Sequence, residues 1–566
     1  MPPASLLAPL IGRKLKMDEY QVPEHNGRRI GREYFWFALT VMAILVGSAA
    51  HASTPSEATP SEAAPAKPKP TVEELEQRIR ILEEKLEALQ APAAATPAPA
   101  AAPAPTLTSA PAPADAKTAG AKASGAPAGV PRSVTVQQAG SATESGPQIF
   151  AGPGGFSFQS ADGADQIRFH GEFDFDGRFY NDDLTPEGSR STWLLRRARP
   201  IIEGTFANIF DFRFNPDFAG GRTVIQDAFV AARFNPLFVV TAGKFKEPFG
   251  LERLQLSPNN RFIELGLPSD LVPNRDLGLQ ASGTFTFAGG TLTYQIGYFD
   301  GVVDGSSTDS NATPDVDSND KKDWVARLFA QPFLKTSSVL RGLGAGVAVS
   351  YVNQVGSPVN TLLAQYKTET QRNFFSYGSA GTSAGTSAGA VFANGERLRI
   401  SPQAYYYYKS FGLLSEYVSE SQDVSRTFGA GAAAVTRTAR LQPSSWQVAA
   451  TYLLTGDAAS FGTVVPKRPF ALDQPGWGAF ELAARISELK LDPATFASPN
   501  GVGTWFADPS AQARDATAWT LGMNWYLTQN VAWYLDYTKT GFDGGAAGAK
   551  NRADENAFFT RFQVAF

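Results

Sequence analysis

The last ten residues, AFFTRFQVAF, constrain the fold most, because they predict a strand with two different faces. Successive side chains of a strand point to opposite sides of its sheet. Phe558, Phe562 and Phe566 therefore share an apolar face, while Arg561 and Gln563 share a polar one. At a soluble sheet edge this pattern would invite aggregation, whereas a strand that closes a barrel would place the apolar face in lipid. Taken alone, the segment is equally compatible with an ordinary amphipathic strand.

The same alternation recurs through residues 147–566 and is clearest over residues 168–180. Phe169, Phe173 and Phe175 fall on one face there, and the intervening residues are mostly charged. A face this rich in ionisable groups does not form a packed core, so we expect it to border water. Sixteen such segments are predicted, near 166–180, 192–206, 209–218, 223–234, 237–246, 276–287, 291–300, 323–333, 344–354, 395–408, 411–420, 444–455, 477–489, 516–527, 531–540 and 556–566.

Short turns and long polar loops alternate between these segments, which is typical of outer-membrane barrels, as is an even number of strands. Forty Phe and 52 Gly fit such a barrel, and a mean hydropathy of -0.18 is too polar for a helical membrane protein. We therefore predict an all-β fold, a 16-stranded antiparallel transmembrane β-barrel. Tryptophans near segment ends suggest interfacial girdles: Trp324, Trp446, Trp477, Trp519, Trp525 and Trp533.

Residues 1–52 are interpreted as a signal peptide. A basic segment precedes the apolar run of residues 35–50, and Ala50-His51-Ala52 provides a cleavage site. Met17 is an alternative start. A single membrane anchor is the competing interpretation, but the apolar run is short for a span.

Residues 53–70 form a Pro/Ala/Ser linker, and residues 71–90 predict a short coiled-coil helix. Thr71 and Glu74 form a capping box, and apolar residues follow at alternating spacings of three and four. A lone helix of this length is marginal, which favours self-association, although the core residues do not fix the number of helices. Residues 91–146 are Ala/Pro-rich and are predicted to be a disordered linker before the barrel.

The composition excludes several functions. There is no cysteine, there are three histidines and the net charge is -4, so neither thiolate metal sites nor nucleic-acid binding is favoured. No nucleophile elbow, zinc motif or P-loop is present. The aspartates of residues 301–320 lack EF-hand spacing and predict a solvated loop rather than a calcium site. We expect no enzyme, no metal and no cofactor.

Strand parity nominates cations that face the interior. Arginine suits anion transport because its planar fork donates two hydrogen bonds to one oxyanion and stays charged. The candidates are Arg197, Arg199, Arg213, Arg233, Lys244, Lys246, Arg327, Arg397, Arg399 and Arg485, with Arg168, Arg178 and Arg561 on the same face. Carboxylates such as Asp174 and Asp217 share that face, so cross-strand pairing that merely neutralises a wet wall is the alternative.

Two connections add further candidates. The stretch 247–275 carries Arg253, Arg261 and Arg275 and is predicted to fold inward as a constriction loop. Lys244 and Lys246 stand where the preceding strand enters it. Lys467 and Arg468 form a second cluster, in the unusually long turn 456–476.

Several motifs resemble the phosphate-selective porins, the porin O and porin P type of Gram-negative bacteria. They are Leu194-Leu195-Arg196-Arg197-Ala198-Arg199, Gly243-Lys244-Phe245-Lys246-Glu247-Pro248-Phe249-Gly250, Arg399-Ile400-Ser401-Pro402-Gln403, Leu454-Thr455-Gly456-Asp457 and Trp477-Gly478-Ala479-Phe480-Glu481. The resemblance spans the barrel region. It implies a sixteen-stranded trimer, loops and one long periplasmic turn inside the lumen, and lumenal Arg and Lys that draw oxyanions through.

The sequence therefore predicts an outer-membrane porin of a Gram-negative bacterium, in contact with lipid, homotrimeric and passing small solutes with a preference for anions such as phosphate. A general diffusion porin is the first alternative. A soluble exported β-rich binding protein on a coiled-coil stalk is the second, and it would have to bury every Phe-rich face between sheets.

Overall fold

The structure, a computed structural model, describes residues 146–181, 191–221, 223–301, 320–383, 385–499 and 503–566. The predicted signal peptide, both linkers and the coiled coil lie outside these residues. No helix in the described part is long and apolar enough to cross a membrane.

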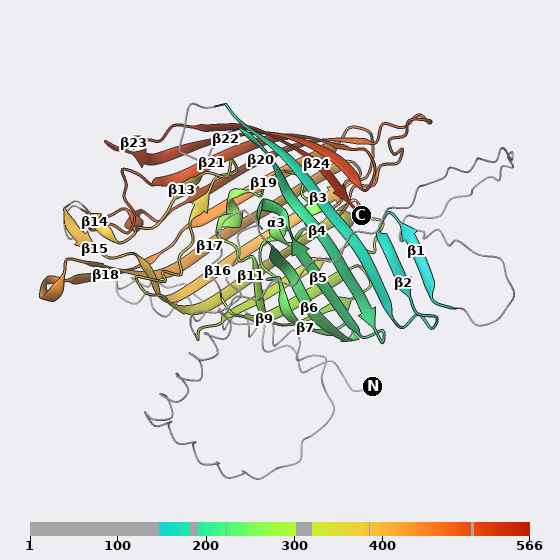
Figure 1. Ribbon diagram of the computed structural model, residues 1–566, viewed down its shortest axis with the longest axis horizontal. Helices are drawn as coiled ribbons and strands as arrows, with labels where there is room; N and C mark the ends of the chain where they lie inside the picture. Colours follow the sequence, from blue (N-terminus) through green and yellow to red (C-terminus); the bar gives the residue numbers. More distant parts are fainter. Residues whose placement is uncertain (1–145, 182–190, 222, 302–319, 384, 500–502) are drawn as a thin grey trace, which may run out of the picture. The chain divides into compact units, whose positions relative to one another are not determined.

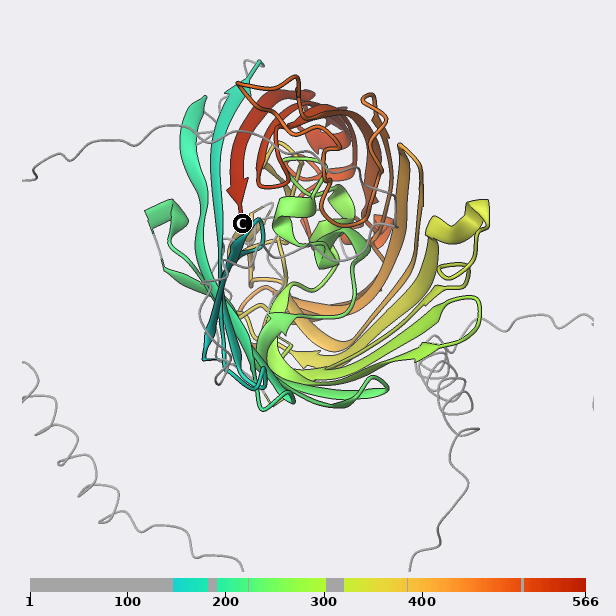
Figure 2. The ribbon, with the colours of Figure 1, turned by 90° about the vertical axis from the view of Figure 1, so that its right-hand side faces the viewer.

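Sixteen antiparallel strands form a closed ring (Figures 1 and 2). In ring order they are β3 (Gln166–Tyr180), β4 (Thr192–Phe206), β5 (Phe210–Asp217), β6 (Val224–Asn235), β7 (Phe238–Lys246), β8 (Arg275–Thr286), β9 (Thr291–Phe299), β10 (Asp323–Gln331), β11 (Leu343–Val355), β16 (Phe392–Tyr408), β17 (Phe411–Phe428), β19 (Ser444–Leu453), β20 (Ala479–Lys490), β21 (Ala513–Tyr526), β22 (Val531–Ala546) and β24 (Glu555–Ala565). The predicted barrel is confirmed.

The remaining elements are short and lie outside the sixteen strands of the ring. They are β1 (Gln148–Gly152), β2 (Gly155–Gln159), β12 (Tyr366–Lys367), β13 (Asn373–Phe375), β14 (Gly381–Ser383), β15 (Thr386–Ala388), β18 (Val435–Leu441), β23 (Lys550–Asn551), the helix α3 (Leu251–Leu254), and the 3₁₀ turns η1 (Ala219–Gly221), η2 (Ser257–Asn259), η3 (Leu267–Asp270), η4 (Val339–Gly342), η5 (Gly431–Ala433) and η6 (Pro493–Thr495).

The ring closes where the C-terminal strand meets the first one. β24 pairs with β3 from Ala557 opposite Tyr180 to Ala565 opposite Glu172. Phe566 and Gly171 then exchange two backbone hydrogen bonds of 3.0 Å. A Cβ at Gly171 would lie 2.7 Å from the Phe566 ring, so glycine is needed for this close approach. The first residues of β3, before Gly171, have no partner on β24 and pair instead with β2. The sequence pattern did not predict β2 as a strand separate from the barrel.

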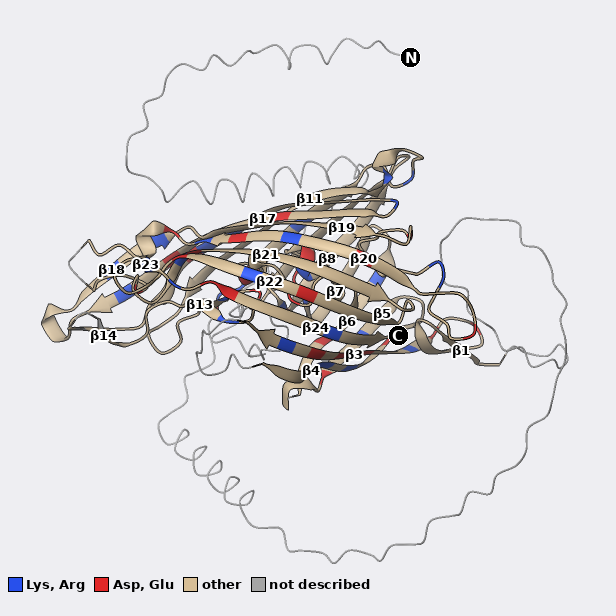
Figure 3. Ribbon diagram, turned by 90° about the horizontal axis from the view of Figure 1, so that it is seen from above, with Lys and Arg blue, Asp and Glu red and all other residues tan. Residues whose placement is uncertain are grey.

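The two faces of the ring are as predicted. On β3, Phe173 and Phe175 are exposed by 47% and 42%, whereas Asp174 and Asp176 are fully buried. Arg561 of β24 is also buried, and its neighbour Phe562 is exposed. Seen from above, charged residues of both signs are spread over most barrel strands (Figure 3). The exposed phenylalanines lie on the outward face of the closed sheet, and the other sheet that the described residues form is the two-stranded pair β12–β13, whose aromatic residues Tyr366, Phe374 and Phe375 are buried.

Two predicted strands were too short. The segment predicted at 411–420 continues to Phe428, and the one predicted at 531–540 continues to Ala546. The outward-facing residues that these extensions add are polar or small, such as Asp423, Thr427 and Asp543, whereas their apolar residues Val424, Phe428 and Phe542 are buried. β17 pairs there with β18 rather than with the next barrel strand. Pairing in water needs no lipid-facing residues, so hydrophobic alternation does not mark these extensions.

Parts of three connections lie in the interior, whereas the β14–β15 hairpin of the second one pairs with the extension of β17. The constriction loop, residues 247–274, carries α3 and lies within the ring (Figure 2). The inserted loop, residues 356–391, and the long turn, residues 454–478, both make hydrogen bonds to the constriction loop. The inward fold predicted for 247–275 is therefore seen, although Arg275 is the first residue of β8 rather than a loop residue.

Candidate functional site: the charged interior of the barrel

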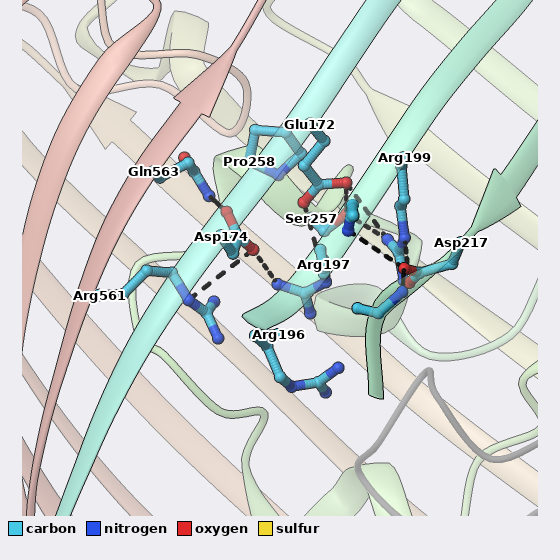
Figure 4. A network of polar contacts seen from close by, with 12 residues as sticks. Glu172, Asp174, Arg196, Arg197, Arg199, Asp217, Ser257, Pro258, Arg561 and Gln563 are labelled. Carbon is cyan, nitrogen blue, oxygen red and sulfur yellow. Dashed lines mark hydrogen bonds and ion pairs between the residues drawn. The ribbon is translucent and has the colours of Figure 1, made fainter. Parts of the chain in front are cut away.

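An ionic network joins β3, β4 and β24 on the inner wall (Figure 4). Arg197 Nη1 donates to Asp174 Oδ2 at 2.7 Å, and Arg561 donates twice to Asp176, at 2.7 and 2.8 Å. Arg199 Nε donates to Asp217 at 2.7 Å, and its Nη1 reaches Glu172 at 3.2 Å. Strand register accounts for three of these contacts, because Arg197 stands opposite Asp174, Arg199 opposite Glu172 and Arg561 opposite Asp176. Asp217 is the last residue of β5, the neighbouring strand of β4. These three arginines are therefore paired with carboxylates of the wall.

Sequence parity missed Arg196. Asp174 stands opposite Arg197, and the next β3 residue, Phe175, stands opposite Leu195, so Arg196 is the extra residue of a β-bulge. The bulge turns two consecutive arginines inward, and both are buried. Arg196 Nε lies 3.6 Å from Glu264 of the constriction loop. Its two Nη atoms have no hydrogen-bond partner among the described residues. A strict period-two pattern contains no signal for such a residue.

The predicted lysine pair marks the anchor of the constriction loop. Lys246 Nζ donates to the carbonyl oxygens of Arg253 and Gln255, each at 2.6 Å, and so holds the C-terminal end of α3 to β7. Arg253 in turn donates to the Ser269 carbonyl at 2.8 Å. Lys244 is buried on the same strand. Anion contact by these residues stays a prediction.

Arg261 ties the constriction loop to the long turn. One Nη atom donates to the carbonyl oxygens of Ser460, at 2.5 Å, and Gly462, at 2.8 Å. Gln255 donates to the Phe461 carbonyl at 2.8 Å, and the Phe461 ring stacks on Tyr405 of β16 with centroids 4.9 Å apart. Two inserts from opposite rims therefore meet inside the barrel.

Arg485 of β20 holds the constriction loop and the inserted loop together. It donates to Glu252 at 2.9 Å and pairs with Glu369 at 2.7 Å, with its guanidinium over the Phe262 ring. Glu369 also accepts hydrogen bonds from Ser487 and Thr520 of the wall. The sequence nominated Arg485 as a pore-facing cation but gave no sign of Glu369, which is a single acidic residue in a polar loop.

The remaining nominated cations fall into three groups. Those paired with carboxylates are Arg168 and Arg213 with Glu203, Arg178 with Glu264, Arg233 with Asp211, Arg261 with Glu481, Arg275 with Asp227, and Arg397 and Arg399 with Asp323. Lys467 and Arg468 are exposed on the long turn, where Lys467 donates to the Gly456 carbonyl. Arg327 forms a group of its own.

Arg327 has no ion-pair partner in the part of the chain that the structure describes. Its Nε and Nη1 donate to the amide oxygens of Gln403, at 3.0 Å, and Gln295, at 3.2 Å. The guanidinium lies over the Phe329 ring, 4.4 Å from the centroid. Its side chain is only partly buried. Because two neutral amides hold it, its charge is not cancelled by a contacting carboxylate and extends into the interior.

No cluster of three or more His, Asp or Glu side chains suited to a metal ion occurs in the described ranges.

Comparison with known proteins shows the family to which the chain belongs. The family model of the phosphate-selective porin O and P matches residues 166–566, which is the whole ring. This chain belongs to that family. This porin has distant likeness to solved outer-membrane structures. The channel DcaP of Acinetobacter baumannii is 10% identical over 72% of this chain and 99% of its own, with a TM-score of 0.42. The anion-selective porin from Comamonas acidovorans is 11% identical over 71% and 100%, with a TM-score of 0.40. OmpT of Vibrio cholerae is 12% identical over 71% and 98%, with a TM-score of 0.39. No curated protein matches the chain.

Proposed function

We propose that this porin forms a water-filled channel that passes small hydrophilic solutes and favours anions such as phosphate. The carrying observation is a closed sixteen-stranded ring with apolar side chains outside and ionisable ones inside. Family membership supports the same conclusion. In this proposal the apolar face contacts lipid of a Gram-negative outer membrane, the chain is exported by residues 1–52, and three copies associate with help from the helix of residues 71–90.

Anion preference in this proposal depends on charges that the wall does not cancel. Most interior arginines contact a carboxylate, which leaves little net field at those positions. Arg327 is different, since amide oxygens and an aromatic ring hold it. A permeant anion is attracted by such a site and released from it, as conduction requires. No catalytic step enters the proposal.

The paired arginines also favour a second candidate, a general diffusion pore without phosphate preference. Its charges would be separated across the lumen but balanced, and the observation behind it is the network of Arg197, Arg199 and Arg561 with four carboxylates, Glu172, Asp174, Asp176 and Asp217. The two candidates differ in ion selectivity.

Reversal potentials in planar bilayers separate the two candidates. We expect anion selectivity in a potassium chloride gradient and a chloride current that falls when phosphate is added. Arg327→Gln should lower the anion-to-cation permeability ratio by about twofold or more, the direction that loss of one uncompensated charge predicts. Lys539→Gln, on the outer face where Lys539 pairs with Asp554, is the matched control and should leave the ratio unchanged. Cation selectivity that persists in phosphate would reject the anion proposal and leave the general pore.

A further inference from the structure

Five exposed cations lie on one sector of the rim at which the chain ends. They belong to the β10–β11 turn (332–342), the β16–β17 turn (409–410) and the long turn, and they are Lys335, Arg341, Lys409, Lys467 and Arg468. The other described turns of this rim contain neither Lys nor Arg, and they are residues 160–165, 207–209, 236–237, 287–290 and 527–530. Positive charge on these turns is therefore confined to one sector, which we call the basic arc.

Carboxylates do not cancel the charge of the basic arc. Its three turns contain two acidic residues, Asp457 and Asp473, which leaves a net charge of +3. Asp457 is 2% exposed and accepts the backbone N–H of Lys467 at 2.6 Å, so it is enclosed within the long turn. Within the described ranges none of the five cations forms an ion pair, and Lys467 Nζ donates to the Gly456 carbonyl.

The three turns form one continuous surface. The hydroxyl group of Tyr406, near the end of β16, donates to the Val339 carbonyl of the β10–β11 turn at 3.0 Å. The backbone N–H of Ala459 in the long turn donates to the Lys409 carbonyl at 2.7 Å. Ser410 Oγ also donates to the long turn, to the Asp457 carbonyl at 2.9 Å. These bonds hold the five cations together along one stretch of the rim.

Outward-facing aromatic residues border the basic arc. Tyr406 and Tyr408 stack with their ring centroids 6.3 Å apart, and Lys409 Nζ lies 5.3 Å from the centroid of the Tyr408 ring. Tyr452 and Trp477, near the long turn, are exposed by 53% and 69%. Aromatic girdles of this kind lie at the level of the lipid headgroups. Long basic side chains next to them extend their charged ends to that level.

We propose that the basic arc binds anionic phospholipids through their phosphate groups. The inference rests on the proposed contact of the outer face with lipid, and it adds the headgroup charge that this sector of the rim selects. Lys and Arg donate charge-assisted hydrogen bonds to phosphate oxygens. In a zwitterionic lipid a cation lies beside the phosphate and offsets this attraction. Each basic side chain at the surface favours the anionic lipid about fivefold.

Native mass spectrometry of the full chain in detergent measures the preference. The probes are dioleoyl phosphatidylglycerol and dioleoyl phosphatidylcholine, which share their acyl chains and differ in headgroup charge. We expect phosphatidylglycerol to bind about fivefold more tightly or better at low salt, and the preference to decline as salt is added. Equal affinities overturn this inference alone, whereas binding of neither lipid overturns the proposed lipid contact as well.

Variants locate the preference on the basic arc. Arg341→Gln and Lys409→Gln each remove one charge, so each should weaken phosphatidylglycerol about fivefold and leave phosphatidylcholine unchanged. Arg514→Gln is the matched control, because it makes the same change of net charge on the opposite rim, where Arg514 pairs with Asp543. The assignment is overturned if neither arc variant weakens phosphatidylglycerol, or if Arg514→Gln weakens it as much.

Two other occupants of the basic arc predict different results. Glycerophosphoglycerol is the same headgroup without acyl chains, so it should not displace the lipid at equal concentration; displacement would assign the arc to a free phosphodiester and overturn the inference. The segment 71–90 has six Glu and three Lys or Arg. If it covered the arc, phosphatidylglycerol would have no advantage over phosphatidylcholine, which also overturns the inference.

Discussion

Replacing Arg261 with alanine should release the long turn from the constriction loop. The wild-type guanidinium bridges the two inserts through the carbonyl oxygens of Ser460 and Gly462. It also lies 3.6 Å from Glu481 of β20 and over the Tyr526 ring. Alanine removes all of these contacts and leaves two backbone oxygens without their donor.

The magnitude follows from the two bridging bonds. A hydrogen bond to a charged group contributes about 1.5–3 kcal/mol net, so the pair contributes about 3–6 kcal/mol. Each 1.4 kcal/mol changes an equilibrium constant about tenfold. The undocked population of the turn should therefore rise about 10²-fold or more. The hydrogen bonds from Gln255 to Phe461 and from Thr463 to Asn259 remain in the variant. We therefore expect an increase in the undocked population near 10²-fold, the lower end of the range.

The absence of cysteine makes the assay simple. Val464 is 2% exposed in the docked turn, so a single thiol introduced by Val464→Cys reacts only when the turn opens. The rate of maleimide labelling then reports the open population. Arg261→Ala in this background should label about 100-fold faster. Arg468→Ala, an exposed arginine of the same turn, should label at the parental rate.

An unchanged labelling rate in Arg261→Ala, with the barrel still folded by its heat-modifiable gel mobility, would refute the bridge. A rate that rises equally in Arg468→Ala would show that the turn responds to any loss of charge.

Two further predictions concern buried carboxyl groups. Asp323→Asn leaves Arg397 and Arg399 without their shared carboxylate at nearly inaccessible positions, so it should lower the free energy of unfolding in denaturant by about 3–5 kcal/mol. The control Asp543→Asn, whose pair with Arg514 is half exposed, should lower it by less than about 1 kcal/mol. Equal losses would contradict the argument from burial. Burial raises the pKa of Asp270 in the folded protein, so the wild type loses stability as the pH rises from the unfolded-state pKa of about 4 through the folded-state pKa. Asp270→Asn should therefore have the wild-type melting temperature below about pH 4 and a higher melting temperature than the wild type near pH 8. A variant that is less stable than the wild type near pH 8 would show that the fold stabilises the charged form.

Period-two alternation was enough to define the ring. Each strand must satisfy its backbone polar groups with its neighbours and must present one face to lipid and one to water. Those demands act on every residue of a strand, so they can be recognised from a few consecutive residues, such as the alternation from Phe173 to Asp176. The limits of β3 and β4 were predicted to the residue for the same reason. Beyond the apolar band the demand disappears, and there the predicted ends of β17 and β22 were too early.

Site details were beyond the reach of parity. Whether Arg199 meets Asp217 or stays open to solvent depends on the register of neighbouring strands, which alternation does not specify. The bulge at Arg196 needs the register on both sides of one residue. Arg327 contacts Gln295, which stands opposite it on β9, and Gln403 of β16, which lies beyond the neighbouring strand β11, so its amide partners also depend on how the strands are ordered.

The sequence by itself determined the barrel and its two faces, because these follow from side-chain order along single strands. Only the tertiary structure decided which of the predicted inward cations are neutralised, and how the constriction loop, the inserted loop and the long turn meet. Those contacts join residues up to hundreds of positions apart, such as Arg261 with Ser460. Their energies depend on burial and on distances of a few ångströms, which exist only once the ring has closed.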